Sequence, residues 1–210
     1  MYLPPLFAMD DVETMHRMIG AFPLGAIITQ TADGLTADHI PLLVEPAASG
    51  DGHILVGHVA RNNPLWQPEQ PGAEVLVIFQ GESAYITPNW YATKQETHQV
   101  VPTYNYCVVH VHGPLVIHDD PKWTRMAIGK LTKRMGAAEP VPWKMGDAPQ
   151  DYLREMVTQI VGIEIPIRQM TGKWKTSQNR PEADRAGVVA GLEARNHHFD
   201  TAMAALVRKV

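Results

Sequence analysis

Residues 103–106 (TYNY) carry more hydrogen-bonding capacity than an ordinary strand needs. The β-branched residues that follow them predict a strand, and alternation along it places Thr103 and Asn105 on one face. Tyr104 and Tyr106 then lie on the other face. An aromatic face beside amide and hydroxyl groups suits a flat heteroaromatic ligand. The alternative is that the two tyrosines only fill a corner of a barrel.

The stretch GHVARNNPLW places a turn between an expected strand and an expected short helix. Ala60, Arg61 and Asn62 lie in this turn, and Pro64 suits the first turn of the helix. Free backbone N–H groups at a helix start, together with a guanidinium group, make a site suited to a phosphate. The alternative is that Asn62 or Asn63 only caps the helix while Arg61 is solvated.

The stretch GKWKTSQNRPEADR places polar residues where an expected strand gives way to a helix that begins at Pro181. The four polar residues before this proline are Ser177, Gln178, Asn179 and Arg180. Alternation along the strand puts Lys173 and Lys175 on one face and Trp174 on the other. These donors and acceptors could hold a polar ring edge or a phosphate. The alternative is a capped helix start beside a charged strand face.

Two histidines raise the question of a metal site. His110 and His112 lie two positions apart on an expected strand and would share a face, as two zinc ligands can. No third ligand with the spacing of a known motif accompanies them, so we expect no metal ion. The sequence also lacks the glycine-rich nucleotide loops, the GxSxG elbow and the HExxH and CxxC motifs.

The first half of the chain predicts a helix followed by short strands. Asp10 can cap a helix that has Glu13 at its capping-box position and that ends at Pro23. Strands and hairpin turns are expected over residues 24–45, 54–60, 73–88 and 107–118. Within the third of these ranges, the apolar run 73–81 is typical of a central strand buried on both faces.

The second half adds helices around one more stretch of strand. Asp119 or Asp120 caps a helix that begins at Pro121, and strand is expected again over residues 161–178. A second helix has one apolar stripe, formed by Tyr152, Met156, Val157 and Ile160. We therefore expect an α+β fold, an antiparallel β-barrel with helices packed outside it. The chain reads as a single domain, residues 1–210, with a helical insertion over about 119–160 and C-terminal helices over about 181–210.

Composition is that of a globular protein, with 45% apolar and 19% charged residues in a chain of 210 residues. The start of the chain lacks a basic region before an apolar stretch, so we expect no signal peptide, and no run is long enough to span a membrane. The single cysteine, Cys107, permits no intramolecular disulfide, so a cytoplasmic location is expected.

The net charge of −4 conceals an asymmetry between the two parts of the chain. Residues 1–120 hold 3 basic and 13 acidic side chains, whereas residues 121–210 hold 15 basic and 9 acidic ones. Either the later helices simply expose Lys and Arg, or this part of the chain faces an anion such as a phosphate, a nucleic acid or an acidic partner.

Six segments, in order along nearly the whole chain, resemble the PaiB-like family of FMN-binding regulators. They are MYLPPLF, ADHIPLL, GHVARNNPLW, VLVIFQGESAYITPNWY, VPTYNY with VHVHG, and GKWKTSQNR. Two positions depart from the family pattern, in which a tryptophan is usual at Tyr104 and a leucine at Thr176.

The resemblance implies an FMN-binding split β-barrel, a homodimer with the flavin at the subunit interface, and the description transcriptional regulator. By similarity to split-barrel flavoproteins, the turn formed by Ala60, Arg61 and Asn62 would hold the phosphate. The residues along the isoalloxazine edge would be Thr36, Ala37, Asp38 and His39. The residues that complete the pocket would be Thr103, Tyr104 and Asn105 together with Ser177, Gln178, Asn179 and Arg180.

Three functions remain open. The first is an FMN-dependent oxidoreductase or flavin reductase of unknown substrate, in which Lys173 or Arg180 stabilises the reduced flavin near N1. The second is a negative transcriptional regulator that binds DNA or a protein partner and could respond to flavin, and DNA is considered because basic residues gather after Pro121. These are Lys122, Arg125, Lys130, Lys133 and Arg134. The third is a flavin carrier or sensor without turnover.

Overall fold

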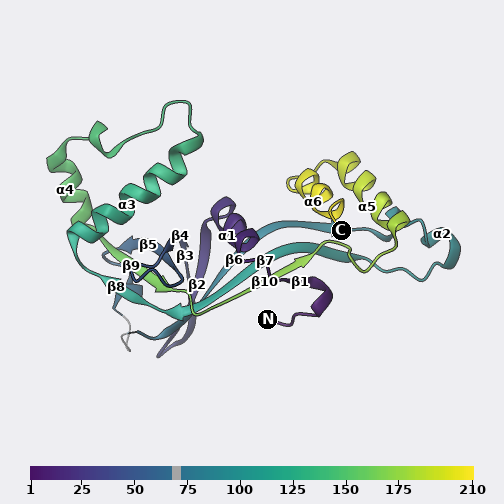
Figure 1. Cartoon of the computed structure of the whole chain (residues 1–210), viewed down its shortest axis with the longest axis horizontal. Helices are drawn as coiled ribbons and strands as arrows, with labels where there is room; N and C mark the ends of the chain where they lie inside the picture. Colours follow the sequence, from purple (N-terminus) through teal and green to yellow (C-terminus); the bar gives the residue numbers. More distant parts are fainter. Residues whose placement is uncertain (68–71) are drawn as a thin grey trace. The chain divides into compact units, whose positions relative to one another are not determined.

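The computed structural model describes residues 1–67 and 72–210 (Figure 1). Its strands are β1 (Ala8–Met9), β2 (Leu24–Thr31), β3 (Gly34–Pro41), β4 (Leu43–Pro46), β5 (His53–Ala60), β6 (Glu74–Ile86), β7 (Thr103–Pro114), β8 (Val116–His118), β9 (Ile160–Pro166) and β10 (Gln169–Lys175). The α-helices are α1 (Val12–Ala21), α2 (Lys94–Thr97), α3 (Pro121–Met135), α4 (Gln150–Thr158), α5 (Glu182–Arg195) and α6 (Asp200–Val207). Short 3-10 turns include η2 (Pro64–Trp66) and η3 (Pro88–Trp90).

The strands form two sheets, in agreement with the expected α+β class. One has the order β1-β10-β7-β6-β2-β3 and the other β4-β5-β9-β8. The hairpin β2–β3 pairs Leu24 with Pro41 and Thr31 with Gly34 in antiparallel register. Gly34, the last residue of the turn, has a φ of +115°, which only glycine adopts readily. A glycine at this position therefore allows the tight turn between β2 and β3. No helix in the described part of the chain is long and apolar enough to cross a membrane.

The chain forms two compact units, and β6 and β7 contribute residues to both. Unit 1 consists of residues 1–18, 80–110 and 171–210, and unit 2 of residues 19–79 and 111–170. The single domain expected from the sequence stays a prediction. The predicted insertion of two helices between β8 and β9 corresponds to α3 and α4, and the C-terminal helices correspond to α5 and α6.

The core of unit 1 joins the end of β6 to α5 and α6. Ile86, Leu192 and Met203 are fully buried in it. Trp90 packs against α5 at Gly187 and Gly191, because a Cβ at Gly191 would lie only 2.2 Å from the indole. Glycine at these positions therefore lets the helix approach the aromatic ring.

Arg195 and Asp200 connect α5 to α6. The guanidinium Nε and Nη2 of Arg195 donate to the two carboxylate oxygens of Asp200 at 2.7 and 2.6 Å. The same guanidinium lies 4.9 Å from the ring centroid of Trp90 and donates to the carbonyl oxygen of Tyr85 at 3.0 Å. This hydrogen-bonded pair with Arg195 is the main reason that the pKa of Asp200 lies below its ordinary value of 3.8.

Asp200→Asn should therefore lower the free energy of unfolding by about 1.5–3 kcal/mol at neutral pH, as expected for a hydrogen bond to a charged group. A carboxyl whose pKa is lowered by folding contributes its stability above the unfolded pKa, and the contribution is lost as the pH falls through the folded pKa. The difference in the free energy of unfolding between the native protein and the variant should thus be largest at pH 7 and become smaller in acid. Urea unfolding of both proteins at several pH values measures it, and a difference that grew in acid would contradict the assignment.

The core of unit 2 lies between the β5–β9 pair and α3. Val59 pairs with Val161 in the antiparallel register, and both are buried. Trp123 of α3 lies over Gly162, where a Cβ would be 2.3 Å from the indole. The Trp123 ring also stacks on His118 of β8 at 3.8 Å between centroids. The insertion is therefore attached to the sheet through an aromatic contact that requires glycine.

Three local expectations are corrected by the structure. The cap of α1 is Asp11, whose carboxylate accepts from the Thr14 N–H at 3.0 Å, so the helix begins one residue later than the Asp10 cap predicts. Strand β6 continues unbroken to Ile86, and only its alternate residues are fully buried in the run 74–81. The buried stripe of α4 contains Leu153 and Val157.

Of the predicted apolar stripe of α4, Val157 is buried, whereas Ile160 lies beyond the helix at the start of β9. Tyr152 and Met156 are 53% and 36% exposed. The buried face of α4 carries Leu153 and Val157, each one residue after an exposed member of the predicted stripe, and the helix contacts α3 and β9.

Candidate functional site

The most unusual polar group in unit 1 is the side chain of Asn105, which lies near the start of β7 and is 0% exposed. Its Nδ2 donates to Ser177 Oγ at 2.9 Å, whereas its Oδ1 is buried with no hydrogen-bond partner among the described residues. A buried amide oxygen left without a donor costs roughly 1–3 kcal/mol. An acceptor of this kind is well suited to a ligand N–H.

The turn after β10 is held by hydrogen bonds from its own side chains, and Ser177 in this turn contacts Asn105. Ser177 has a φ of +67°, in the left-handed region that non-glycine residues seldom adopt. Gln178 holds the turn, since its Oε1 accepts from the Thr176 N–H at 2.7 Å and its Nε2 donates to the Trp174 carbonyl at 2.6 Å. The N–H of Arg180 donates to the Ser177 carbonyl at 3.0 Å. Strain of this type is common at ligand sites.

Three cations accompany this turn. Lys173 is only 8% exposed, and its Nζ donates to the Tyr2 carbonyl at 3.1 Å and lies 5.3 Å from the ring centroid of Tyr106. The guanidinium of Arg180 lies 4.4 Å from the ring centroid of Tyr91. Lys175 is half-buried. None of the three forms an ion pair with a carboxylate in residues 1–67 and 72–210.

The remaining predicted residues of unit 1 differ in their accessibility. Asn179 is exposed, and Tyr104 is 52% exposed. Thr103 is half-buried and contacts Lys175 through its Oγ1. The structure therefore brings Thr103, Asn105 and Ser177 together with the cations and leaves Tyr104 and Asn179 open to solvent.

In unit 2, the predicted phosphate contact Arg61 already has protein partners. Its Nη1 and Nη2 donate to the two oxygens of Asp119 at 3.2 and 2.6 Å, and its Nε donates to the Thr158 carbonyl at 2.6 Å. A further contact joins Nη2 to the Ile160 carbonyl at 3.3 Å, and the guanidinium lies 5.4 Å from the centroid of Trp66. This pairing raises the pKa of Arg61 and lowers that of Asp119. An anion at Arg61 would have to compete with Asp119.

The helix start predicted after this turn is the single 3-10 turn η2, and backbone N–H groups in and just before it already have partners within the protein. The N–H of Arg61 donates to the Gln159 carbonyl, that of Asn63 to the Ala60 carbonyl, and that of Leu65 to Asn63 Oδ1. The prediction of free N–H groups at a helix start is therefore wrong for these three residues. Asn63 is the cap, as the alternative interpretation allowed.

The predicted isoalloxazine-edge residues lie on β3. Asp38 is half-buried and accepts from Asn63 Nδ2 at 2.7 Å, which ties this strand to the turn after β5. Thr36, Ala37 and His39 are exposed, as are Ala60 and Asn62. These residues are available to a ligand or partner, and their binding role stays a prediction.

Sequence reasoning missed the contact of Lys175 with Thr103 and the pairing of Asp119 with Arg61. Lys175 occupies a strand position whose alternation was evident, but its contact with Thr103 joins residues 72 positions apart. Asp119 was assigned only as a helix cap, a role that the structure gives to Asp120. Neither contact leaves a local signal in the sequence.

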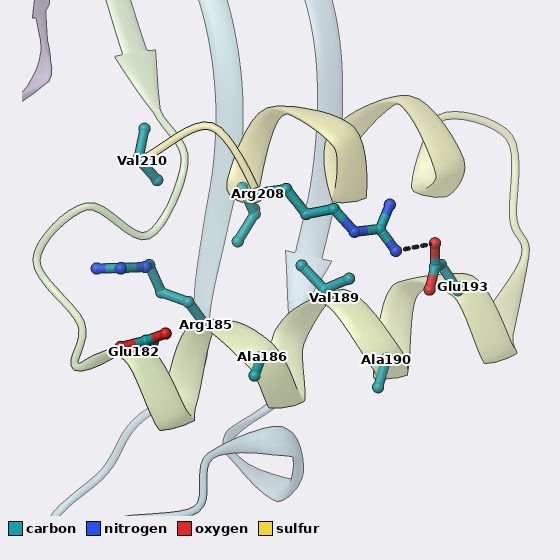
Figure 2. Close-up of a pocket in the computed structure, with 9 residues that line it drawn as sticks. Glu182, Arg185, Ala186, Val189, Ala190, Glu193, Arg208 and Val210 are labelled. Carbon is teal, nitrogen blue, oxygen red and sulfur yellow. Dashed lines mark hydrogen bonds and ion pairs between the residues drawn. The ribbon is translucent and has the colours of Figure 1, made fainter.

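A separate hollow lies on α5 and α6 and contains none of the predicted site residues (Figure 2). Its lining residues are Glu182, Arg185, Ala186, Val189, Ala190, Glu193, Val207, Arg208 and Val210. Figure 2 shows Arg208 paired with Glu193 at one end of it. Within the described residues, no three His, Cys, Asp or Glu side chains gather as a set of metal ligands.

Comparison with known proteins adds a family and a fold. Residues 1–169 match the family model described as "Putative FMN-binding domain". An uncharacterized protein of Emericella nidulans is 31% identical over 243 residues, covering 100% of this chain and 97% of its own length. The "Protease synthase and sporulation protein PAI 2" of Bacillus subtilis is 29% identical, covering 92% of this chain and 89% of its own.

A solved structure, the FAD and heme binding protein from Mycobacterium smegmatis, superposes with a TM-score of 0.61 at 13% identity. It covers 85% of this chain and 78% of the other. At this identity the likeness concerns the fold, and it confirms the split-barrel architecture predicted from the sequence. The family model confirms FMN as the cofactor.

Proposed function

This chain belongs to the PaiB-like family of FMN-binding split-barrel proteins, and we propose that it works as an FMN-dependent oxidoreductase or flavin reductase. The observation that carries the proposal is the buried, unpartnered Oδ1 of Asn105 beside cations that no carboxylate neutralises in the described part of the chain. The pyrimidine edge of a flavin offers an N–H between two carbonyl oxygens, so it matches both an acceptor and positive charge.

The residues of unit 1 would each have a defined task toward this cofactor. Asn105 would accept a hydrogen bond from the ring N–H, and Ser177 would keep the amide oriented through its contact with Nδ2. Lys173 and Arg180 would stabilise negative charge at the ring edge. When bound, FMN supplies a ring that accepts and returns a hydride, so the protein needs no dedicated catalytic acid–base pair.

The absorption spectrum of the purified protein tests the proposal directly. We expect a flavin band that survives desalting after incubation with FMN, and its bleaching by NADH or NADPH. A protein that takes up no FMN would contradict the proposal. FMN retained without any reaction with NADH or NADPH would point instead to a flavin carrier or sensor.

The turn after β5 is the proposed phosphate end, and Asp119→Asn should tighten FMN binding there by up to about fivefold. The exposed Arg61–Asp119 pair is weak enough for a phosphate to replace, and the variant removes the competing carboxylate. Arg61→Gln should weaken binding. FMN fluorescence titration measures both affinities, and equal affinity in the two variants and the native protein would remove Arg61 from the phosphate site.

A homodimer with the flavin at the subunit interface is part of the same proposal. The exposed residues of β3 and the turn after β5 would then be available to the second copy. Size-exclusion chromatography with light scattering, with and without FMN, should give twice the 23.3 kDa mass of the chain. A monomer that binds FMN with full affinity would contradict the interface.

The alternative of a DNA-binding regulator draws less support from the structure. Of the basic residues that suggested it, Lys130 pairs with Glu45 at 2.6 Å and Arg125 donates to Gln150 at 2.9 Å. Phosphate contacts by these two side chains would first have to break those interactions. Absence of a gel shift at low salt would end this alternative.

A further inference from the structure

The three cations beside Asn105 and Ser177 in unit 1 are Lys173, Lys175 and Arg180. The proposed flavin function gives a role to Lys173 and Arg180 but none to Lys175. Lys175 ends β10 and is half-buried, and its Nζ hydrogen-bonds with Thr103 Oγ1 at the start of β7. The contact fixes the end of a long, flexible side chain on a strand. Such a constraint is not needed for a lysine whose only task is to be solvated.

The charges that face Lys175 are Lys173 and Arg180, together with the phenol of Tyr106. Among the described residues no carboxylate pairs with it. The pKa of Lys175 lies below its ordinary value of 10.5, first because burial disfavours the ammonium form, and then because Lys173 and Arg180 repel it, while Tyr106 acts in the opposite direction. Lys175 therefore gives up its proton more readily than an ordinary lysine does.

A neutral amine is a nucleophile, and two neighbouring cations raise the local concentration of anions. We propose that Lys175 is a reactive amine that captures a small anionic aldehyde as an imine. Thr103 orients the amine, and Lys173 and Arg180 attract the anionic group of the aldehyde. The capture needs no bound FMN and so stands apart from the flavin function.

The step balances without any redox partner. The lone pair of Lys175 Nζ forms a bond to the carbonyl carbon as the C–O π bond breaks. Proton transfer from nitrogen to oxygen gives a carbinolamine, which loses water as the C=N bond forms. One aldehyde and one amine become one imine and one water molecule.

The experiment uses glyoxylate as the anionic aldehyde and cyanoborohydride to trap the imine on the full chain. Mass mapping after digestion then gives the rate of labelling at each lysine. The exposed Lys122, Lys133 and Lys209 are internal controls in the same sample. We expect Lys175 to be labelled about tenfold faster than these, at the low end of what focused charge does to association rates.

Three comparisons separate the contribution of the neighbouring charges from that of the amine. Propionaldehyde, which is neutral, should show no comparable preference for Lys175, and the double variant Lys173→Gln, Arg180→Gln should lose the preference for glyoxylate. As the pH is raised, labelling of Lys175 should begin at lower pH than that of Lys122, because a lowered pKa frees the amine sooner.

Labelling of Lys175 no faster than that of the exposed lysines, or equal preference for both aldehydes, would overturn the proposal. The comparison among lysines of the native protein decides this even if the double variant does not fold. Preferential labelling of Lys175 in a protein that binds no FMN would support this inference and contradict the flavin function. FMN binding without preferential labelling of Lys175 would support the flavin function and contradict this inference.

Discussion

Replacing Gly187 with alanine should lower the free energy of unfolding by about 3 kcal/mol or more, the upper range for overpacking of a core. The Cβ of alanine at this position would lie 1.9 Å from the carbonyl oxygen of Trp90, far inside any contact that atoms tolerate. The obstacle is backbone, so no change of side-chain rotamer relieves it. Either α5 or the segment around η3 has to move.

The direction of this effect separates packing from helix propensity. Alanine stabilises a helix interior by roughly 1 kcal/mol relative to glycine, so propensity alone predicts a more stable variant. Gly136→Ala, at the C-cap of α3, is the control for adding a methyl group without a clash, because nothing lies within 4 Å of its Cβ. Urea unfolding measures both variants, and a Gly187→Ala protein as stable as the native one would show that Trp90 does not sit against α5.

Displacement of Trp90 should also weaken FMN binding at the candidate site. Tyr91 follows Trp90 in the chain, is buried, and lies under the guanidinium of Arg180 at 4.4 Å. We therefore expect the Gly187→Ala protein to bind FMN more weakly than the Gly136→Ala control. The contact links the helix packing of unit 1 to the position of one cation of the site.

The elements could be predicted from the sequence because their signals are local. The strand that begins at Thr103 is an example: alternation placed Asn105 and Tyr104 on opposite faces, and the structure has the first buried and the second exposed. Helix starts were located to within a residue or two, as the shift from Asp10 to Asp11 shows, because neighbouring acidic residues compete for the same cap.

The pairings within the site could not be predicted, because they join distant parts of the chain. Asn105 and Ser177 are 72 positions apart, and Arg61 and Asp119 are 58 apart. Nothing near Arg61 in the sequence indicates that a carboxylate occupies its guanidinium. The excess of polar residues in each stretch was visible, but which of their atoms would remain without a partner depends on the tertiary contacts.

Asn105→Leu should weaken FMN binding by about 10- to 100-fold, since a ligand hydrogen bond to a buried acceptor is worth roughly 1–3 kcal/mol. The same change should alter the stability of the FMN-free protein by less than about 1 kcal/mol. Leucine loses the contact with Ser177, but it also removes the buried Oδ1 that has no donor, and the two effects oppose each other. If Asn105 only stabilised the fold, its replacement would lower the stability and leave the FMN affinity largely unchanged.

Ser177→Ala is the matched control, because it removes the partner of Asn105 Nδ2 and leaves Oδ1 in place. This variant should be less stable than the native protein by about 1–3 kcal/mol, the cost of an unsatisfied buried donor, while it keeps more of its FMN affinity than Asn105→Leu does. Thermal unfolding without FMN and fluorescence titration with FMN give the two quantities for each variant. If both variants lost stability and affinity in the same proportion, Asn105 would be a structural residue, and the unpartnered oxygen would not be the place where the ligand N–H binds.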